Sequence, residues 1–226
     1  MVFDLHAHTE FSRCGRDKPE SLVKKMIEEG VDVFGISDHN YGIAGRWGEY
    51  FDEVTKLKQK YADKIKILRG VEICTLPQYA LNEDEDVSCF DYCIVENLDS
   101  PESVIGGDIV KFSKRLNTVT GIAHTDLFSF AKTRKEGVYE YLKSLADVGI
   151  FWELNVNYDS IHGYREHAYV KRFFGSEEEQ ETVKKTGLKL SVGFDGHRME
   201  DYDVSRVVKA CEFLRQKKIR TVLEDI

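Results

Sequence analysis

The sequence predicts a single α/β domain over residues 1–226, in which parallel strands form a barrel surrounded by helices. Short apolar runs alternate with longer segments of helical periodicity about seven times, which is typical of repeated βα units. A chain of 226 residues can bury a sizeable core in one domain, and no stretch has the composition of a linker. The runs predicted as strands are Val2–Leu5, Val33–Ser37, Ile65–Arg69, Tyr92–Val95, Val119–Ala123, Ile150–Asn155 and Leu188–Gly193.

Between these runs, the segment Pro19–Gly30 is predicted as a helix, with Pro at its first turn and Gly at its end. Its apolar residues Leu22, Val23, Met26 and Ile27 fall on one helix face, which we expect to pack on the sheet. The same periodicity predicts helices over Tyr50–Tyr61, Val138–Val148 and Val204–Lys217, and one over Ser103–Leu116 whose start is weakened by Gly106 and Gly107.

Composition favours a soluble, cytoplasmic protein. The formal net charge is −8, whereas a protein that binds nucleic acid through phosphate contacts normally shows a basic face, so long nucleic acid is a poor fit as a partner. No apolar run is long enough to cross a membrane, and Asp4 and His6 interrupt the early apolar run that a signal peptide would need. The five cysteines form no CxxC pair, and Cys74 and Cys93 lie in or beside apolar runs, as buried free thiols do.

Two segments depart from the βα rhythm. Leu76–Ser88 is acidic and is predicted to be a solvated loop. Asn157–Gly175 follows the sixth predicted strand and is rich in Tyr, His and Arg. Because the loops after the strands of a parallel barrel form its active site, we expect this second segment to contact substrate. Its two histidines, His162 and His167, are predicted to be surface or substrate-contacting residues rather than metal ligands.

Imidazole and carboxylate side chains follow several predicted strands, which predicts a metal site at one end of the barrel. His6 and His8 are separated by one residue, so both project from the same face of an extended strand and can bind one divalent ion. Alone, such a pair is also compatible with two surface histidines. The metal interpretation is favoured because similar residues follow other strands, namely Asp38 and His39, Glu72, His124, and Asp195 with His197.

The roles of single residues stay open at this level. Asp38 is either a ligand or a carboxylate that orients an imidazole, and a capping Asp is the plain alternative. Glu72, placed at the end of the third predicted strand, has two oxygens and can bridge two cations. Alone, Glu72 is an ordinary surface acid and His124 a structural histidine. The mixture of nitrogen and oxygen ligands, without clustered thiolates, favours open catalytic metals over a structural zinc site.

The ordered set His6-Ala7-His8, Ser37-Asp38-His39, Gly70-Val71-Glu72, His124 and Asp195-Gly196-His197 resembles the PHP (polymerase and histidinol phosphatase) family. The resemblance covers nearly the whole chain. It implies a distorted seven-stranded (β/α)7 barrel of the TIM-like kind, phosphoester hydrolysis, and two or three divalent ions (zinc, iron or manganese) at the strand carboxyl ends. By position it implies that a first metal is held by His6, His8, Glu72 and Asp195, that Glu72 bridges to a second completed by His124, and that a third is held by His39 and His197.

The chain departs from the family pattern at two places. Family members usually carry a His just after the fourth strand, where this chain offers Glu96 or Asn97. A neutral amide oxygen is a poorer ligand for zinc or iron than imidazole, so weak binding of the second metal is expected if Asn97 serves. In the loop after His8, where some relatives supply a further His or Asp, either Cys14 or Asp17 serves or the loop does not ligate.

The predicted activity is metal-dependent hydrolysis of a small phosphomonoester, as in a histidinol phosphatase. A metal-bound hydroxide, formed near neutral pH because coordination lowers the pKa of water, attacks phosphorus in line. Arg165 lies in a region where similar phosphatases of the family carry an arginine, and it is predicted to clamp phosphate oxygens; a solvated helix residue is the alternative. Asp38 or His197 is predicted to protonate the leaving alkoxide.

Two other functions fit the sequence. One is a nucleotide or nucleic-acid phosphoesterase, for which a single nucleotide suits the acidic chain better than a long polymer. The other is a metal-binding regulatory protein that has lost catalysis, which the departure at Asn97 motivates.

Overall fold

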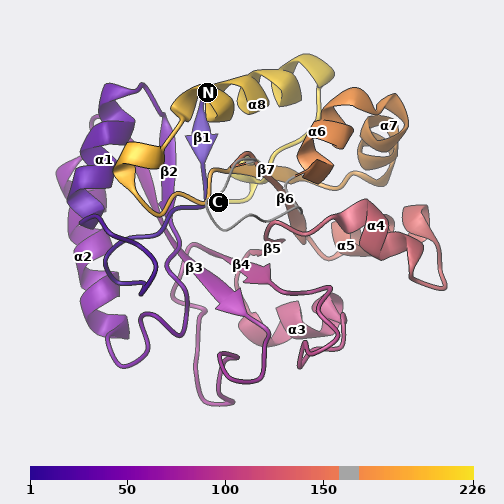
Figure 1. The fold of residues 1–226 in the computed structure, drawn as a ribbon, viewed down its shortest axis with the longest axis horizontal. Helices are drawn as coiled ribbons and strands as arrows, with labels where there is room; N and C mark the ends of the chain where they lie inside the picture. Colours follow the sequence, from indigo (N-terminus) through magenta and orange to yellow (C-terminus); the bar gives the residue numbers. More distant parts are fainter. Residues whose placement is uncertain (158–167) are drawn as a thin grey trace.

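The structure is a computed structural model, and it describes residues 1–157 and 168–226 (Figure 1). Its centre is one sheet of seven parallel strands, in which every strand pairs with the next along the chain. Because the strand order equals the chain order, each connection returns over the outside of the sheet, as the βα rhythm predicts. The strands are β1 Phe3–Asp4, β2 Val33–Ile36, β3 Lys66–Cys74, β4 Tyr92–Glu96, β5 Thr120–Ile122, β6 Phe151–Asn155 and β7 Leu190–Gly193.

The first and last strands meet and nearly close the barrel. The Leu5 amide donates to the Val192 carbonyl at 2.9 Å, and Ala7 forms a parallel bridge with Gly196. The Asp195 amide donates to the His6 carbonyl at 2.7 Å. The predicted seven-stranded barrel is therefore confirmed, and its seam places the segments after β1 and β7 side by side.

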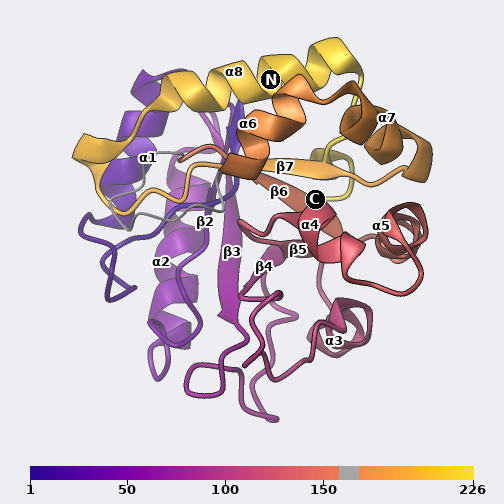
Figure 2. The same ribbon diagram turned by 45° about the vertical axis from the view of Figure 1, so that its right-hand side comes forward.

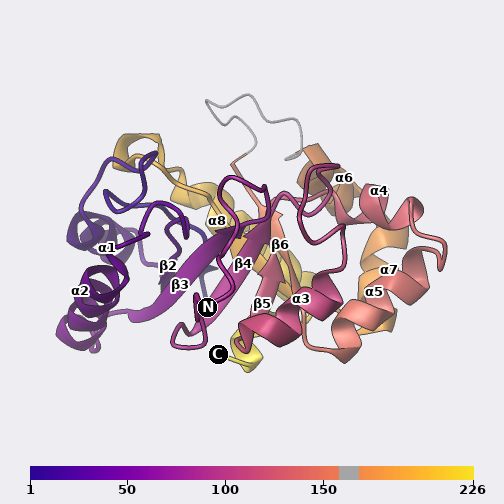
Figure 3. The ribbon, with the colours of Figure 1, turned by 90° about the horizontal axis from the view of Figure 1, so that it is seen from below.

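Helices cover the outer face of the sheet. In Figure 1, α1 and α2 flank β2 and β3 on one side, α4 to α7 lie on the other, and α8 crosses beside β1; Figure 2 shows α6 and α8 closer to the viewer. Figure 3 shows β3, β4 and β6 from below, between these two groups of helices. The helices are α1 Pro19–Glu28, α2 Trp47–Lys60, α3 Ile109–Leu116, α4 Leu127–Lys132, α5 Val138–Asp147, α6 Ala168–Gly175, α7 Glu177–Thr186 and α8 Val204–Lys217, with 3-10 turns at Met199–Asp201 and Val222–Glu224. No helix in residues 1–157 and 168–226 combines the length and apolar character that a membrane crossing requires.

The structure corrects several predicted boundaries. The third strand continues to Cys74, so Glu72 lies within β3 instead of at its end. Helix α3 begins only at Ile109, because Gly106 and Gly107 adopt positive φ angles and Asp108 caps the helix by accepting from the Lys111 amide at 3.0 Å. Helices α4, α6 and α7 are short, and the sequence periodicity did not predict them.

The barrel interior is filled by a tyrosine from β4. The hydroxyl of Tyr92 donates to the Leu5 carbonyl at 2.6 Å, which connects β4 to the chain after β1. Gly35 and Gly70 leave the space for this ring, because a Cβ on either would overlap with the Tyr92 side chain. Tyr92 is fully buried, so the barrel is a packed core, and any chemistry must lie at its ends.

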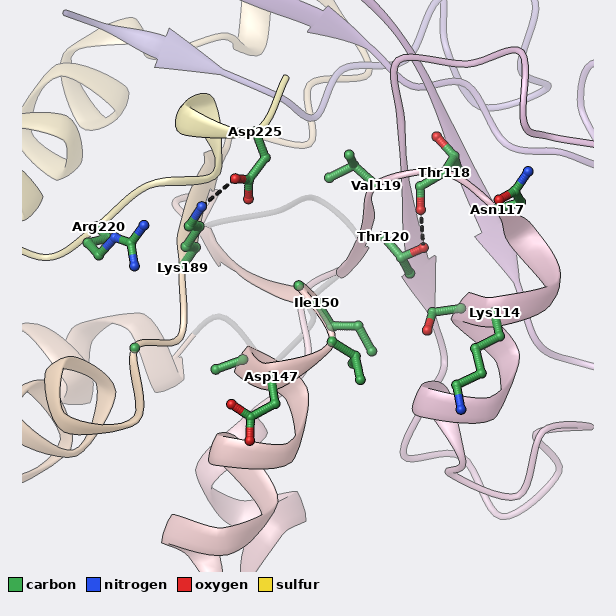
Figure 4. A pocket seen from close by; sticks show the side chains of 15 residues that line it. Lys114, Asn117, Thr118, Val119, Thr120, Asp147, Ile150, Lys189, Arg220 and Asp225 are labelled. Carbon is green, nitrogen blue, oxygen red and sulfur yellow. Dashed lines mark hydrogen bonds and ion pairs between the residues drawn. The ribbon is translucent and has the colours of Figure 1, made fainter.

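A cavity of about 810 Å³ lies at the amino ends of β5, β6 and β7 (Figure 4). Two of its charged residues are paired, since Lys189 contacts Asp225 and Arg220 contacts Glu224 at 2.7 Å. Because the predicted metal ligands follow the carboxyl ends of the strands, this cavity lies at the opposite end of the barrel from them.

Candidate metal centre

Four histidines surround the carboxylate of Glu72. The Nε2 atom of His6 lies 3.3 Å from Oε1 of Glu72, and Nε2 of His124 lies 3.0 Å from the same oxygen. The other oxygen, Oε2, lies 3.3 Å from Nε2 of His8 and 2.9 Å from Nδ1 of His39. Each oxygen of Glu72 therefore faces two imidazoles, which fits a carboxylate that bridges two cations.

The segment after β7 adds two more predicted ligands. Oδ1 of Asp195 lies 3.1 Å from Nε2 of His8 and 3.5 Å from Nε2 of His6. The ring of His197 stacks on that of His8, with 4.5 Å between ring centroids. Asp195 has a φ of 57°, which a non-glycine residue rarely adopts, and this turn directs the chain back toward His8. All seven predicted metal ligands thus meet at one end of the barrel.

The positions of these residues follow from the sheet. Ala7 is bridged to Gly196, so His6 and His8 on either side of Ala7 lie beside the segment that carries Asp195. His39 is bridged to Glu72 in parallel register, three residues beyond Ile36, the last paired residue of β2. Parallel strands bring their carboxyl ends to the same end of a barrel, which is why residues from distant segments converge.

The centre is buried and electrostatically unusual. Glu72 has no exposed area, and His6 and His8 are each 1% exposed. Nδ1 of His39 and Oε2 of Glu72 are buried atoms that lack a hydrogen-bond partner within the described residues, although they lie 2.9 Å apart. Leaving such atoms unpaired is costly, and a cation coordinated by both would satisfy them. The donor set therefore fits a divalent metal.

The pKa values reflect the same crowding of charges. Burial lowers the pKa of His6, but Glu153, Glu72 and Asp195 outweigh it and raise the pKa well above its usual range. Burial also lowers the pKa of His124, while the hydrogen bond with Glu72 raises it to about 9. Burial raises the pKa of Glu72, but the surrounding histidines hold it well below its usual range. The carboxylates thus favour the charged form of the imidazoles, and the imidazoles favour the charged form of the carboxylate, while burial opposes both.

Glu153 is a functional residue that sequence reasoning missed. It lies in β6, is 1% exposed, and its Oε1 lies 2.6 Å from Nδ1 of His6. Its Oε2 accepts from the backbone amide of His124 at 2.7 Å. Gly193 makes room for it, because a Cβ there would overlap with Glu153 Oε1. An acid inside an otherwise apolar predicted strand was the available signal, since a buried carboxylate needs partners.

The structure places Asp38 apart from the ligand groups. Its Oδ1 accepts from the amides of Thr9 at 2.7 Å and Ser12 at 3.1 Å, and its Oδ2 accepts from the Thr9 hydroxyl at 2.6 Å. Asp38 has no exposed area. Both oxygens therefore accept hydrogen bonds from the loop after His8.

The structure shows where the candidate ligands lie at the two places where the chain departs from the family pattern, after β4 and in the loop after His8. Oε1 of Glu96 lies 3.4 Å from Nδ1 of His39, whereas Asn97 turns its amide toward Sγ of Cys74 at 3.5 Å. Of the two candidates in the loop after His8, the ligand atom of Cys14 lies within 4.8 Å of those of three histidines, while Asp17 accepts from the Met199 amide at 2.7 Å. Glu96 and Cys14 are therefore the two candidates whose ligand atoms lie near the predicted histidine ligands.

Three groups of side chains in the described ranges 1–157 and 168–226 are close enough to hold a metal ion. They are His6, His8 and Asp195; His39, Glu72 and Glu96; and His8, Cys14, His39 and His197. His8 and His39 each belong to two groups, so the groups are adjacent positions of one centre. Arg165, the predicted phosphate contact, and His162 and His167 lie outside the described residues.

Together, the fold and site define a seven-stranded parallel β/α barrel with a buried histidine–carboxylate centre at the carboxyl ends of its strands. The model of the PHP domain matches residues 4–198, so the chain belongs to the PHP domain family.

Two curated relatives are similar to this chain in sequence. The DNA polymerase/3'-5' exonuclease PolX of Bacillus subtilis is 23% identical over 219 residues, which cover 88% of this chain and 35% of PolX. The histidinol-phosphatase of Lactococcus lactis is 28% identical over 99 residues, which cover 40% of this chain and 37% of that protein. The matched regions thus span little more than a third of these relatives.

Among solved structures, the histidinol phosphate phosphatase of Lactococcus lactis, complexed with zinc, L-histidinol and phosphate, superimposes with a TM-score of 0.65 at 17% identity. The alignment covers 97% of this chain and 95% of that one. The putative histidinol phosphatase of Listeria monocytogenes gives a TM-score of 0.54 at 17% identity, covering 88% and 96% of the two chains. Both show that the barrel is shared along almost its whole length.

Proposed function

We propose that this chain is a metal-dependent phosphoesterase that hydrolyses a small phosphomonoester. The observation that carries the proposal is the position of Glu72, each of whose oxygens faces two imidazoles at 3.3 Å or less. The membership of the PHP family and the likeness to histidinol phosphatases support the same reaction class.

Divalent cations held at such a centre supply Lewis acidity toward phosphoryl oxygens and lower the pKa of water. The chain's own residues set the geometry. Glu72 spans the adjacent positions, His6 and His124 lie at one of its oxygens, and His8 and His39 lie at the other. We propose zinc, iron or manganese as the metal, at two or three ions per chain.

We propose that His197 is a metal ligand rather than the proton donor. Its Nδ1 lies 2.9 Å from the carbonyl oxygen of Asp195, which leaves Nε2 for a cation, and Asp38, the other predicted donor, is fully enclosed. On sequence grounds alone, we propose that Arg165 contacts the phosphate group. Loss of its guanidinium in Arg165→Ala is expected to raise KM for the ester more than it lowers kcat.

The likeness to histidinol phosphatases makes L-histidinol phosphate the first substrate to test. A second candidate is ester hydrolysis on a nucleotide or nucleic acid, which the likeness to PolX over 88% of the chain favours. The formal net charge of −8 favours a mononucleotide over a long polymer within that candidate.

The decisive experiment measures phosphate release from L-histidinol phosphate, mononucleotides and a short oligonucleotide, before and after chelation and after the return of zinc, iron(II) or manganese. We expect chelation to abolish release and a divalent metal to restore it. Glu72→Gln should abolish release too, while Glu178→Gln, an exposed change on α7, should leave it unchanged. Activity that survives complete metal removal, or that no divalent metal restores, would refute the proposal.

A further inference from the structure

A cysteine, Cys14, lies beside three imidazoles of the candidate metal centre. The ligand atoms of His8, Cys14, His39 and His197 all lie within 4.8 Å of one another. All five cysteines are free in the structure, so Cys14 is not engaged in a disulfide. His39 is 8% exposed, and the rings of His39 and His197 each stack on that of His8, with 4.5 Å between ring centroids. Three imidazoles and one thiol form a set of ligands suited to a tetrahedral metal.

The loop that carries Cys14 is fixed to its surroundings by the backbone. The hydroxyl of Ser12 accepts from the His39 amide at 3.0 Å, and the amide of Arg16 donates to the His197 carbonyl at 3.0 Å. Cys14 lies between these two attachments, so its position is tied to the two histidines that it faces.

The base of the same loop is equally constrained. Asp38 holds Thr9 and Ser12 through three hydrogen bonds of 2.6 to 3.1 Å. Gly15 packs directly on the Thr9 backbone, where a Cβ would overlap with the Thr9 carbonyl. A loop fixed at both ends and at its base holds the sulfur in place before any ion arrives, which lowers the entropic cost of coordination.

Sulfur changes which metal such a position prefers. Thiolate is a soft ligand that favours zinc and similar ions, whereas carboxylate and water favour magnesium and manganese. The group on the other side of His39 contains Glu72 and Glu96, and it offers two carboxylates but no sulfur. The centre thus combines one thiolate–imidazole position with a carboxylate-rich position beside it.

We propose that Cys14 ligates a metal through its sulfur, together with His8, His39 and His197, and that this makes the position selective for zinc-like ions over magnesium and manganese. On binding, the Cys14 thiol loses its proton to solvent and the sulfur lone pair forms the bond to the cation. This inference rests on the metal centre of the proposed function but not on the identity of the ester.

Cobalt(II) substitution tests the sulfur bond directly. Metal-stripped protein titrated with cobalt(II) should develop a near-ultraviolet sulfur-to-cobalt charge-transfer band. Cys14→Ser should lose that band, and Cys89→Ser, which removes an exposed thiol, should keep it. Cys14→Asp, which restores a ligand without sulfur, should bind cobalt without the band. A band of equal intensity in Cys14→Ser, or cobalt binding to the parent without any band, would overturn the proposal.

Thiol labelling gives a second readout that needs no coloured metal. In metal-free protein both Cys14 and Cys89 should react with a thiol reagent, and zinc should protect Cys14 while leaving Cys89 reactive. Magnesium or manganese at the same concentration should protect Cys14 at least tenfold less, as expected for a soft ligand. Equal reactivity of Cys14 with and without zinc would contradict sulfur ligation.

These outcomes separate the two proposals. Cobalt bound without a sulfur band removes the role of Cys14 and leaves the metal centre intact. A protein that binds no divalent metal at all removes the metal centre and the proposed function with it.

Discussion

Glu153 positions His6: Oε1 of Glu153 lies 2.6 Å from Nδ1 of His6, on the side of the ring away from Glu72. A neutral His6 therefore carries its proton on Nδ1 and donates it to Glu153, which leaves the Nε2 lone pair free for a cation. Since both residues are 1% exposed, water does not compete for this hydrogen bond. The pair fixes which nitrogen of His6 is available to a metal.

Glu153→Gln is expected to weaken metal binding by about 10–100-fold, because the amide is a weaker acceptor and no longer polarises the imidazole. Calorimetric titration of metal-stripped protein with zinc measures the effect. The matched control Glu178→Gln changes the same functional group on the exposed surface of α7 and should leave the affinity unaltered. If both variants bind zinc equally well, Glu153 does not position His6.

Gly193→Ala tests the space around the same pair. A Cβ at position 193 would overlap with Glu153 Oε1 and lie 2.6 Å from the His6 Cβ. We expect the free energy of unfolding to fall by about 1–3 kcal/mol, as for other overpacked cores. In Gly48→Ala, where nothing lies within 4 Å of the new Cβ, stability should stay unchanged or rise by up to about 1 kcal/mol. Urea unfolding of both variants measures these changes in stability. Equal stabilities would show that β6 and β7 shift to accommodate the new Cβ at little cost.

The sequence was enough to predict most of this architecture. The strands β2, β4 and β6 are recognisable because most of their buried residues are apolar, and their predicted ends differ from the observed ones by a residue or so. Helix α7 was missed because only Val183 among its buried residues is apolar. Its burial depends on polar side chains such as Gln180, which donates to the Phe173 carbonyl at 2.8 Å, and periodicity cannot reveal such tertiary contacts.

At the site, the order of motifs along the chain predicted residues that the structure brings together, but it could not point to the residues that support them. Glu153 is distant in sequence from His6, and only the closure of the barrel through β7 brings them together. Likewise, the choice between Glu96 and Asn97 depends on a backbone feature, since Asn97 has a φ of 61° and its side chain turns toward Cys74. Neither feature leaves a local sequence signal.

Metal-stripped protein should become less stable as the pH rises. Burial lowers the pKa of His8 and of His124, but contacts with Glu72 and, for His8, Asp195 raise each to about 9, above the ordinary 6.5. A pKa raised by folding contributes stability that is fully present below about pH 6.5 and is lost as the pH passes through about 9. Urea unfolding in the presence of a chelator, over this pH range, should show the decline.

Zinc-loaded protein should show the opposite trend over the same pH range, because ligands must lose their protons before they bind metal. The stabilisation that zinc adds should therefore grow between about pH 6.5 and 9. His8→Gln should flatten both slopes, since it removes one of the titrating ligands. A metal-free protein whose stability is constant or rises with pH would contradict the charge arrangement described for the centre.

Asp38→Asn distinguishes a positioning role from proton donation. Both oxygens of Asp38 accept hydrogen bonds from Thr9 or Ser12, so an amide in its place would direct a donor toward other donors. We expect a loss of about 1–3 kcal/mol in stability, as for other disrupted buried hydrogen bonds, and weaker metal binding because the loop that carries Cys14 loosens. Asp52→Asn, an exposed change on α2, should have neither effect.

The leaving group separates the two roles for Asp38. An alkyl phosphate needs a proton on its departing oxygen, whereas a nitrophenyl phosphate does not, so loss of a general acid slows only the alkyl ester. Because Asp38 has no exposed area and both its oxygens are engaged, we expect Asp38→Asn to slow both esters by the same factor. The measurement compares kcat on the two esters at saturating metal. A selective loss on the alkyl ester would return Asp38 to the role of proton donor and would require its carboxylate to leave the Thr9 loop during turnover.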